Sequence, residues 1–133
     1  MSYDVSSTNN ALIKNSVNKI IKITNYKVKW IILFGSLSKN EERKDSDIDL
    51  CVYLETGKKE RFQTRMKILS SLNEKFDVQT FQDLPIMVRM ELLKGKVIYC
   101  NDITHLNDIA YYTIKEYNLF EHSYKLYLDN SDL

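Results

Sequence analysis

The amino-acid sequence predicts an α/β (α+β) domain in which helices flank one small sheet. Three observations support this fold class. The chain has 133 residues, of which 44% are hydrophobic and 28% charged, so it has the length of one domain and enough apolar side chains for a core. Segments with helical periodicity alternate with short runs of β-branched and aromatic residues. No repeat or Pro/Gly-rich linker interrupts this alternation, so residues 1–133 are expected to form a single domain.

The first half of the chain is predicted to contain one helix and two strands. Apolar residues recur at helical spacing over residues 8–24, which indicates an amphipathic helix. The stretch "VKWIILFG" from Val28 is short, rich in β-branched and aromatic side chains and stopped by Gly35, which is typical of a buried strand. The stretch "DIDLCVYL", residues 47–54, alternates strictly. As a strand it places its aspartates on one face and its aliphatic residues on the other.

The second half is predicted to contain three helices and two strands. A helix is expected over residues 58–73, and "FDVQTF" from Phe76 favours a third strand. A short helix then begins near Pro85 and stops at Gly95, and "KVIYC" forms a fourth strand. The last helix is expected over about residues 102–128. The side chains expected to face the core from the first of these helices are Phe62, Met66, Leu69 and Leu72.

Charge and composition exclude several classes of protein. The chain has 19 Lys and Arg against 18 Asp and Glu, a net charge of +1, which gives no overall electrostatic reason to bind nucleic acid or an anionic membrane. No apolar run approaches the roughly 20 residues that span a bilayer, and "MSYDVSSTNN" lacks the apolar region of a signal peptide. The expectation is a cytoplasmic protein. Cys51 and Cys100 lie in predicted strands and are expected to be buried, reduced thiols.

Asp47 and Asp49 are the first candidates for a functional site. They lie on the same face of the predicted strand, roughly 6.5–7 Å apart along it, so their carboxylates could converge on one or two divalent cations. Mg²⁺ prefers oxygen ligands and commonly takes one or two carboxylates, together with water and substrate phosphate. Asp77, in the third predicted strand, could supply a third carboxylate. The spacing alone leaves the alternative that Asp47 and Asp49 point to solvent from an edge strand. For Asp77 the alternative is a surface residue or a hydrogen-bonded strand end.

Gly35 and Ser36 form a second candidate group, at the end of the strand before the aspartates. A glycine allows the backbone to approach a phosphate closely, and Ser36 offers a hydroxyl and an N–H to the same anion. A glycine that ends a strand is ordinarily only part of a turn. With the aspartates at the start of the next strand, however, phosphate oxygens and metal ions could meet at one place, as in two-metal phosphoryl or nucleotidyl transfer.

The chain contains the G-S-x10-D-x-D signature, with Gly35 and Ser36 at its start and Asp47 and Asp49 at its end. In this it resembles the DNA polymerase β-like nucleotidyltransferase superfamily. The stretches "FDVQTFQDLP" and "ELLKGKVIYC" resemble the strand with the third carboxylate, the Leu-Pro entry to a helix and the glycine-containing turn into the last strand of that family. The resemblance covers about residues 12–100.

The resemblance implies a polymerase β-like core over about residues 8–100, with a small mixed sheet of about four strands, followed by a C-terminal helix over about residues 102–128. The short length makes the chain similar to minimal nucleotidyltransferases encoded beside HEPN-domain toxins. This implies an antitoxin that transfers AMP from ATP to a tyrosine of an RNase toxin. Two alternatives are neutralisation of the toxin by binding alone and nucleotidyl transfer to a small molecule such as an aminoglycoside.

The same resemblance implies roles for the candidate residues. Gly35 and Ser36 would hold the triphosphate of ATP. Asp47, Asp49 and Asp77 would be the catalytic residues and would hold the metal, two Mg²⁺ ions in the family's mechanism.

The predicted last helix is unusually rich in aromatic side chains, which suit protein interfaces. Packing on the sheet and docking of the toxin are both open as explanations.

His105 and His122 lack ligand-forming neighbours in the sequence and are expected to be surface residues. The charged loop at residues 39–44 is expected to be solvated, with Arg43 or Lys44 reaching a phosphate as the alternative. The aromatic residues of the last helix are Tyr111, Tyr112, Tyr117, Phe120, Tyr124 and Tyr127.

Overall fold

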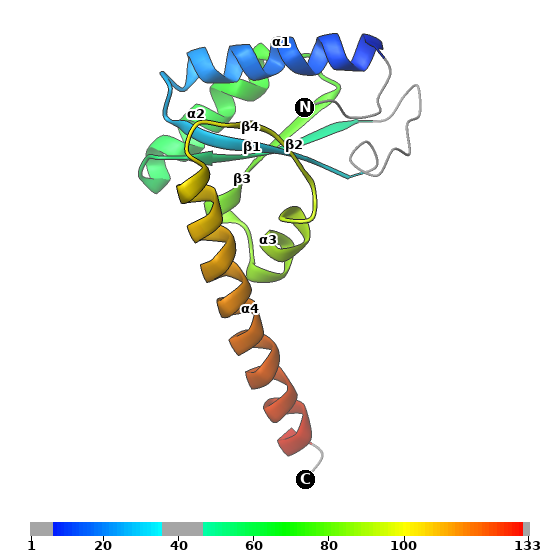
Figure 1. Ribbon diagram of the computed structural model, residues 1–133, viewed down its shortest axis with the longest axis vertical. Helices are drawn as coiled ribbons and strands as arrows, with labels where there is room; N and C mark the ends of the chain where they lie inside the picture. Colours follow the sequence, from blue (N-terminus) through cyan, green and yellow to red (C-terminus); the bar gives the residue numbers. More distant parts are fainter. Residues whose placement is uncertain (1–6, 36–46, 132–133) are drawn as a thin grey trace.

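The computed structural model describes residues 7–35 and 47–131, which form a four-stranded mixed sheet with helices on both faces (Figure 1). This confirms the predicted fold class. The elements in chain order are α1 (Ser7–Ile23), β1 (Val28–Phe34), β2 (Ile48–Leu54), α2 (Lys58–Ser71), β3 (Phe76–Thr80), the 3₁₀-helix η2 (Phe81–Asp83), α3 (Ile86–Leu92), β4 (Lys96–Cys100) and α4 (Ile103–Ser131).

The strand order in the sheet is β3-β2-β1-β4. β1 pairs antiparallel with β2 and β4, whereas β2 and β3 are parallel. A parallel pair needs a crossover connection, and α2 provides it. Because β1 runs against β2, the end of β1 and the starts of β2 and β3 all lie at the same end of the sheet. The predicted glycine and carboxylates are on these three segments.

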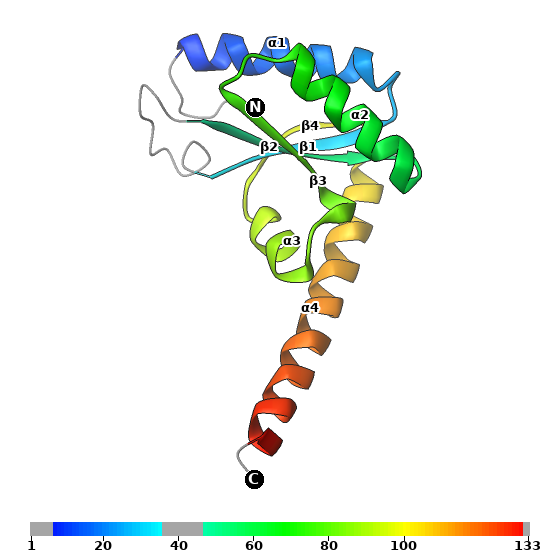
Figure 2. The same cartoon turned by 180° about the vertical axis from the view of Figure 1, so that it is seen from behind.

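α1 and α2 cover one face of the sheet, and α3 and the first turns of α4 lie on the other (Figure 2). Ile48, Leu50, Val52 and Leu54 point to the α1 side, as the alternation of residues in β2 predicts. The residues between them, beginning with Asp49, face the α3 side, where Cys51 belongs to the second core cluster.

The prediction of which side chains of α2 are buried is wrong for the first half of the helix. Phe62 is 62% exposed and Met66 is 39% exposed, whereas Ile68 is fully buried. The side chains that turn toward the sheet instead are Arg61 and Arg65. They donate hydrogen bonds to the backbone oxygens of Thr56 and Val78. β3 is an edge strand, so α2 lies beside backbone carbonyls that need donors, and arginine satisfies them.

The two cysteines differ. Cys51 is buried and free, as predicted, and burial raises the pKa of its thiol. Cys100 is free but only half-buried, so the expectation of a second buried thiol is wrong.

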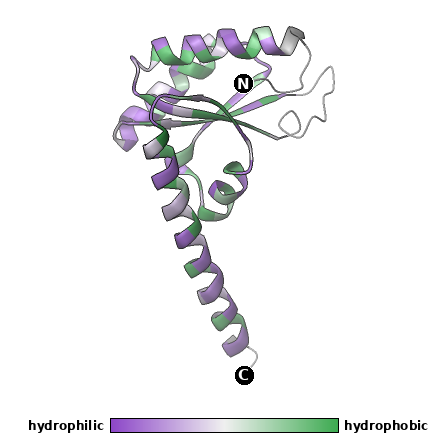
Figure 3. Ribbon diagram, viewed as in Figure 1, coloured by the Kyte–Doolittle hydropathy of each residue, from purple (hydrophilic) through white to green (hydrophobic). Residues whose placement is uncertain are grey.

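α4 packs on the body only through its N-terminal half. Leu106 and Thr113 are buried, but residues 118–130 are all exposed. The C-terminal part projects away from the sheet (Figure 1), and hydrophobic segments recur along its length (Figure 3). None of the helices in the described part of the chain is sufficiently long and apolar to span a membrane.

Candidate active site

Asp49 lies at the centre of the acidic end of the sheet. It is opposite Phe34 of β1 in the antiparallel pair and beside Asp77 of β3 in the parallel pair. Neighbouring strands are about 4.8 Å apart, so the two aspartates are adjacent on the same face. Asp47 precedes β2 and is exposed. The period of two in the sequence predicted the face on which Asp49 lies, and the pairing of β2 with β3 adds Asp77 beside it.

Gly35 fits closely against Asp49. Its φ is +82°, a left-handed conformation that favours glycine, and a Cβ at this position would lie 2.6 Å from Oδ2 of Asp49. The glycine therefore does more than end a strand, because it brings the backbone of β1 against the carboxylate. Any larger residue would push the carboxylate or the chain aside.

The Asp49 carboxyl is in an unfavourable electrostatic environment. Burial raises its pKa first, and the nearby charges of Asp77 and Asp47 raise it further. Within the described residues, no basic side chain forms an ion pair with Asp49. A carboxylate that is held next to other acids and has no ion pair of its own is costly to the fold and is typical of functional sites.

Asp77 has two partners that the sequence did not reveal. Gln79 donates a hydrogen bond from Nε2 to Oδ2 of Asp77 at 3.2 Å, and Nη2 of Arg65 lies 4.0 Å from Oδ1. Arg65 is itself fixed, because its Nε donates to the carbonyl of Val78 at 2.6 Å. Arg65 and Gln79 thus orient the carboxylate of Asp77 next to Asp49.

The carboxylates of Asp47, Asp49 and Asp77 do not enclose a metal ion from all sides. One or two of them could bind a cation whose other ligands come from water and phosphate. No group of three or more His, Cys, Asp or Glu side chains in the described segments is close enough together to hold a metal ion. Mg²⁺ usually takes only one or two carboxylates and completes its shell with water and phosphate, so the donor set still suits it. The shared negative charge around Asp49 supplies the attraction.

Some predicted site residues lie outside the described residues. These are Ser36 of the proposed phosphate group and the loop at residues 39–44, with Arg43 and Lys44. Their predicted contacts with phosphate stay predictions.

His105 is not the surface residue that was expected. Its Nδ1 accepts a hydrogen bond from Nε1 of Trp30 at 3.1 Å, and its ring packs edge-on against Tyr53 with centroids 4.5 Å apart. The two partners are 75 and 52 positions away in the sequence, so no local pattern could reveal them. His122 is exposed on α4, as predicted.

The fold and the acidic strand end place the protein in the class of α+β enzymes that transfer nucleotides at a carboxylate site. Residues 17–104 match the family model described as "Polymerase beta, Nucleotidyltransferase". This match covers more than half of the chain, so the chain belongs to that nucleotidyltransferase family and uses a nucleotide as substrate.

One relative by sequence comes from Methanocaldococcus jannaschii and is named "Putative protein adenylyltransferase MJ1547". It is 36% identical over 85 residues, which are 64% of this chain and 66% of the relative. The match therefore spans slightly less than two thirds of the relative's own length.

Several solved structures with a similar fold are described as toxin–antitoxin proteins. A chain from a toxin–antitoxin crystal structure with AMP-PNP has a TM-score of 0.68 and 21% identity, over 90% of this chain and 98% of that one. A chain from the complex of tri-AMPylated Shewanella oneidensis HEPN toxin with MNT antitoxin has a TM-score of 0.62 and 22% identity, again over 90% and 98%. A chain from the MntA–HepT complex has a TM-score of 0.65 and 20% identity, over 92% and 99%. At these identities the likeness concerns the fold, which includes α4.

Proposed function

We propose that the protein is an antitoxin that transfers AMP from Mg-ATP to a tyrosine hydroxyl of a cognate HEPN-domain RNase toxin and so neutralises it. The observation that carries this proposal is the position of Asp49, which lies between the Gly35 backbone and Asp77 in a nucleotidyltransferase domain. The name of the M. jannaschii relative and the AMPylated toxin in a complex of similar fold support the choice of a protein as acceptor.

The reaction forms one bond and breaks one. The phenolic oxygen of the acceptor tyrosine bonds to the α-phosphorus of ATP, the bond from that phosphorus to the oxygen bridging to the β-phosphate breaks, and pyrophosphate leaves. The phenolic proton would pass to Asp77, the carboxylate that this scheme assigns to the attacking hydroxyl, and then to water. Gly35 and Ser36 hold the triphosphate. When bound, Mg²⁺ neutralises charge on the phosphates and on the leaving pyrophosphate.

Asp47, Asp49 and Asp77 are the residues that would hold the two Mg²⁺ ions. Asp49 is the shared ligand in this assignment, because it alone is next to both other carboxylates. Arg65 and Gln79 keep Asp77 oriented, and the left-handed backbone at Gly35 keeps space for the Asp49 carboxylate.

The test is transfer to the product of the neighbouring gene, provided that this product has the Arg-x4-His motif of HEPN RNases. Incubation with Mg-ATP should add one or more AMP units to a toxin tyrosine, measured by intact-mass and peptide mass spectrometry. The Asp49→Asn variant should lose transfer and should keep its circular dichroism spectrum. An unmodified toxin, in a mixture where the two wild-type proteins bind each other, would exclude the proposal.

A second candidate function is neutralisation by binding alone, and the exposed aromatic residues of α4 favour it. Tyr124 and Tyr127 are 52% and 67% exposed, which is a large apolar surface for one helix. The two functions separate cleanly, because neutralisation by binding needs no ATP and survives Asp49→Asn. Transfer to an aminoglycoside has no comparable structural support, and a drug-modification assay with the same variant would detect it.

A further inference from the structure

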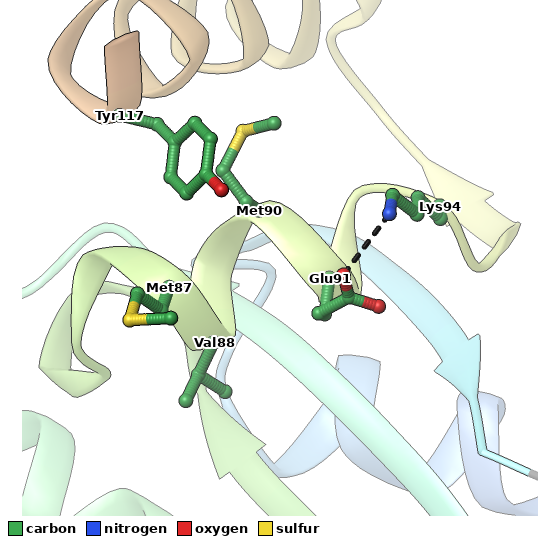
Figure 4. Close-up of a pocket in the computed structure, with 6 residues that line it drawn as sticks. All are labelled: Met87, Val88, Met90, Glu91, Lys94 and Tyr117. Carbon is green, nitrogen blue, oxygen red and sulfur yellow. Dashed lines mark hydrogen bonds and ion pairs between the residues drawn. The ribbon is translucent and has the colours of Figure 1, made fainter. Parts of the chain in front are cut away.

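A groove of 460 Å³ lies between α3 and α4, with mainly apolar walls (Figure 4). Met87, Val88 and Met90 line it from α3, and the ring of Tyr117 projects from α4 beside Met90. Met87 is 57% exposed and Val88 41%, although the inner side of the same helix buries Leu92. An outward helix face with two flexible methionines is typical of surfaces that adapt to a partner.

One end of the groove, at Lys94, lies near the strand end that carries Gly35. Lys94 lines the groove, and the next residue, Gly95, packs so closely on β1 that a Cβ there would lie 2.5 Å from the carbonyl oxygen of Leu33. Leu33 is two residues before Gly35, a distance of about 7 Å along the strand. Asp49 faces the same side of the sheet as α3. A ligand in the groove would therefore extend toward the carboxylates.

The other end of the groove continues along the free part of α4. Tyr117 lines the groove, and Phe120, Tyr124 and Tyr127 follow it at spacings of three, four and three residues. This is the spacing of a seam that packs against another helix. Helices of this length are only marginally stable alone in water, so the projecting end of α4 is suited to being covered.

We propose that an amphipathic helix of the acceptor protein docks in the α3–α4 groove and along the seam of α4, and that this contact presents the acceptor tyrosine to Asp49. The inference rests on the proposed adenylyl transfer. The occupant is a helix because the site lies between two helices, where side-chain ridges of a third can interdigitate. The seam is needed as well as the groove, because a stable interface buries roughly 800 Å² on each partner.

The acceptor protein is the proposed ligand of the groove because the groove lies close to the candidate active site. A protein adenylyltransferase must hold its acceptor near the reacting atoms, and this groove lies between the strand end that carries Gly35 and the exposed aromatic residues of α4. The Glu91–Lys94 ion pair, at 3.0 Å, forms a polar rim on the site-facing end of the groove. A rim of this kind is expected around an apolar anchor site.

The test uses the double variant Met87→Glu/Val88→Glu, which adds charge to the groove at exposed positions. The matched control is Phe62→Glu/Met66→Glu, which adds the same charge at exposed apolar positions of α2, on the opposite face of the sheet. For the groove variant, we expect KM for the toxin to rise at least tenfold while KM for ATP stays within twofold. The control should leave both constants unchanged, and melting temperatures should show that both variants fold.

Three outcomes would overturn the inference. One is an unchanged KM for the toxin in the groove variant. Another is an equal rise in the α2 control, which would indicate a general effect of charge. The third is an effect on self-association alone, seen by sedimentation, which would assign the groove to a second copy of the chain. If the wild-type protein transfers no AMP to the toxin at all, the proposed function itself fails, and this result is distinct from the other three.

Discussion

Asp83 and Asp49 lie at opposite ends of the sheet and have opposite electrostatic environments. Asp83, after β3, receives two hydrogen bonds from Arg61, at 3.0 and 2.7 Å, and one from the hydroxyl of Thr80 at 2.6 Å. The hydrogen bonds from Arg61 are the main reason that the pKa of Asp83 is lowered. Asp49 instead has a raised pKa, because it is partly buried next to two other acids.

The difference is the one expected between a carboxylate that stabilises the fold and one that binds a ligand. Asp83 connects α2 to the end of β3, so its ionised form stabilises the fold. Asp49 destabilises the fold when it is ionised, and such a cost is expected where a ligand compensates for it. α2 makes the same contrast with its arginines, because Arg61 pairs closely with Asp83 whereas Arg65 lies 4.0 Å from Asp77.

The largest effect is expected for Gly35→Ala, at the acidic end. Its Cβ would lie 2.6 Å from Oδ2 of Asp49, and its φ of +82° is strained for alanine. We expect AMP transfer to fall by about 100-fold, because the carboxylate loses its position. The free energy of unfolding should fall by on the order of 1–3 kcal/mol. Single-turnover transfer and urea denaturation measure the two effects, and a variant with wild-type transfer would show that the close contact is not required.

A smaller effect, on stability alone, is expected for Arg61→Met, at the structural end. Loss of the charge-assisted hydrogen bonds to Asp83 should cost about 1–2 kcal/mol of unfolding free energy at pH 7. Asp83 has a lowered pKa in the folded state, so its contribution is present above the unfolded pKa and is lost as pH falls through the folded one. The difference from wild type should therefore shrink below about pH 4. A constant difference down to pH 3 would mean that Arg61 acts by packing only.

Arg65→Met should show the reverse pattern. Its ion pair with Asp77 is long and half-exposed and should contribute little to stability, so the cost should be about 1 kcal/mol, from the lost hydrogen bond of its Nε to the Val78 carbonyl. The concentration of Mg²⁺ that gives half-maximal transfer should instead rise several-fold, because the Asp77 carboxylate loses one of its two orienting partners. Binding of Mn²⁺, followed by electron paramagnetic resonance, should weaken in parallel. Arg61→Met is the matched control, and equal metal binding in the two variants would contradict the role of Arg65.

The contrast also explains what the sequence could and could not predict. Asp49 and Gly35 were found because their chemistry depends on local spacing, a period of two in β2 and a glycine at a strand end. The contribution of α2 was missed, because the helical stripe of Phe62 and Met66 looked like a core face. The arginines on the other side of the helix are used instead, since Arg65 donates to the edge strand at Val78 and Arg61 donates to the turn before α2 at Thr56. Which side of α2 faces the sheet depends on how α2 packs against β3, and this cannot be read from the sequence of either segment alone.

His105 illustrates the same limit from another direction. Its partners, Trp30 and Tyr53, belong to β1 and β2, and the contact exists only once α4 is seated on the sheet. For α4, the sequence showed that the helix is rich in aromatic residues but left open whether they pack on the sheet or face a partner. The sequence does not show at which residue α4 stops packing on the sheet and becomes exposed, because this depends on the extent of the sheet.

The smallest expected effect is a gain of stability in Asp49→Asn, measured without metal. The folded-state pKa of Asp49 is raised, so protonation of this group favours the fold: the contribution is fully present below the unfolded pKa and is lost as pH rises through the folded pKa. At pH 7 the wild-type side chain is ionised among other acids, and the amide removes that repulsion. The melting temperature should rise by roughly 2 °C, which corresponds to about 0.5 kcal/mol for a domain of this size.

Two conditions should remove the advantage of the amide. Below about pH 4 the wild-type carboxyl is protonated, so the two melting temperatures should converge. Saturating Mg²⁺ should stabilise the wild-type protein but not the variant, because only the folded site with its full charge binds the ion. If Asp49→Asn were instead less stable than wild type at pH 7 without metal, Asp49 would be a structural carboxylate like Asp83, and the distinction between the two ends of the sheet would fail.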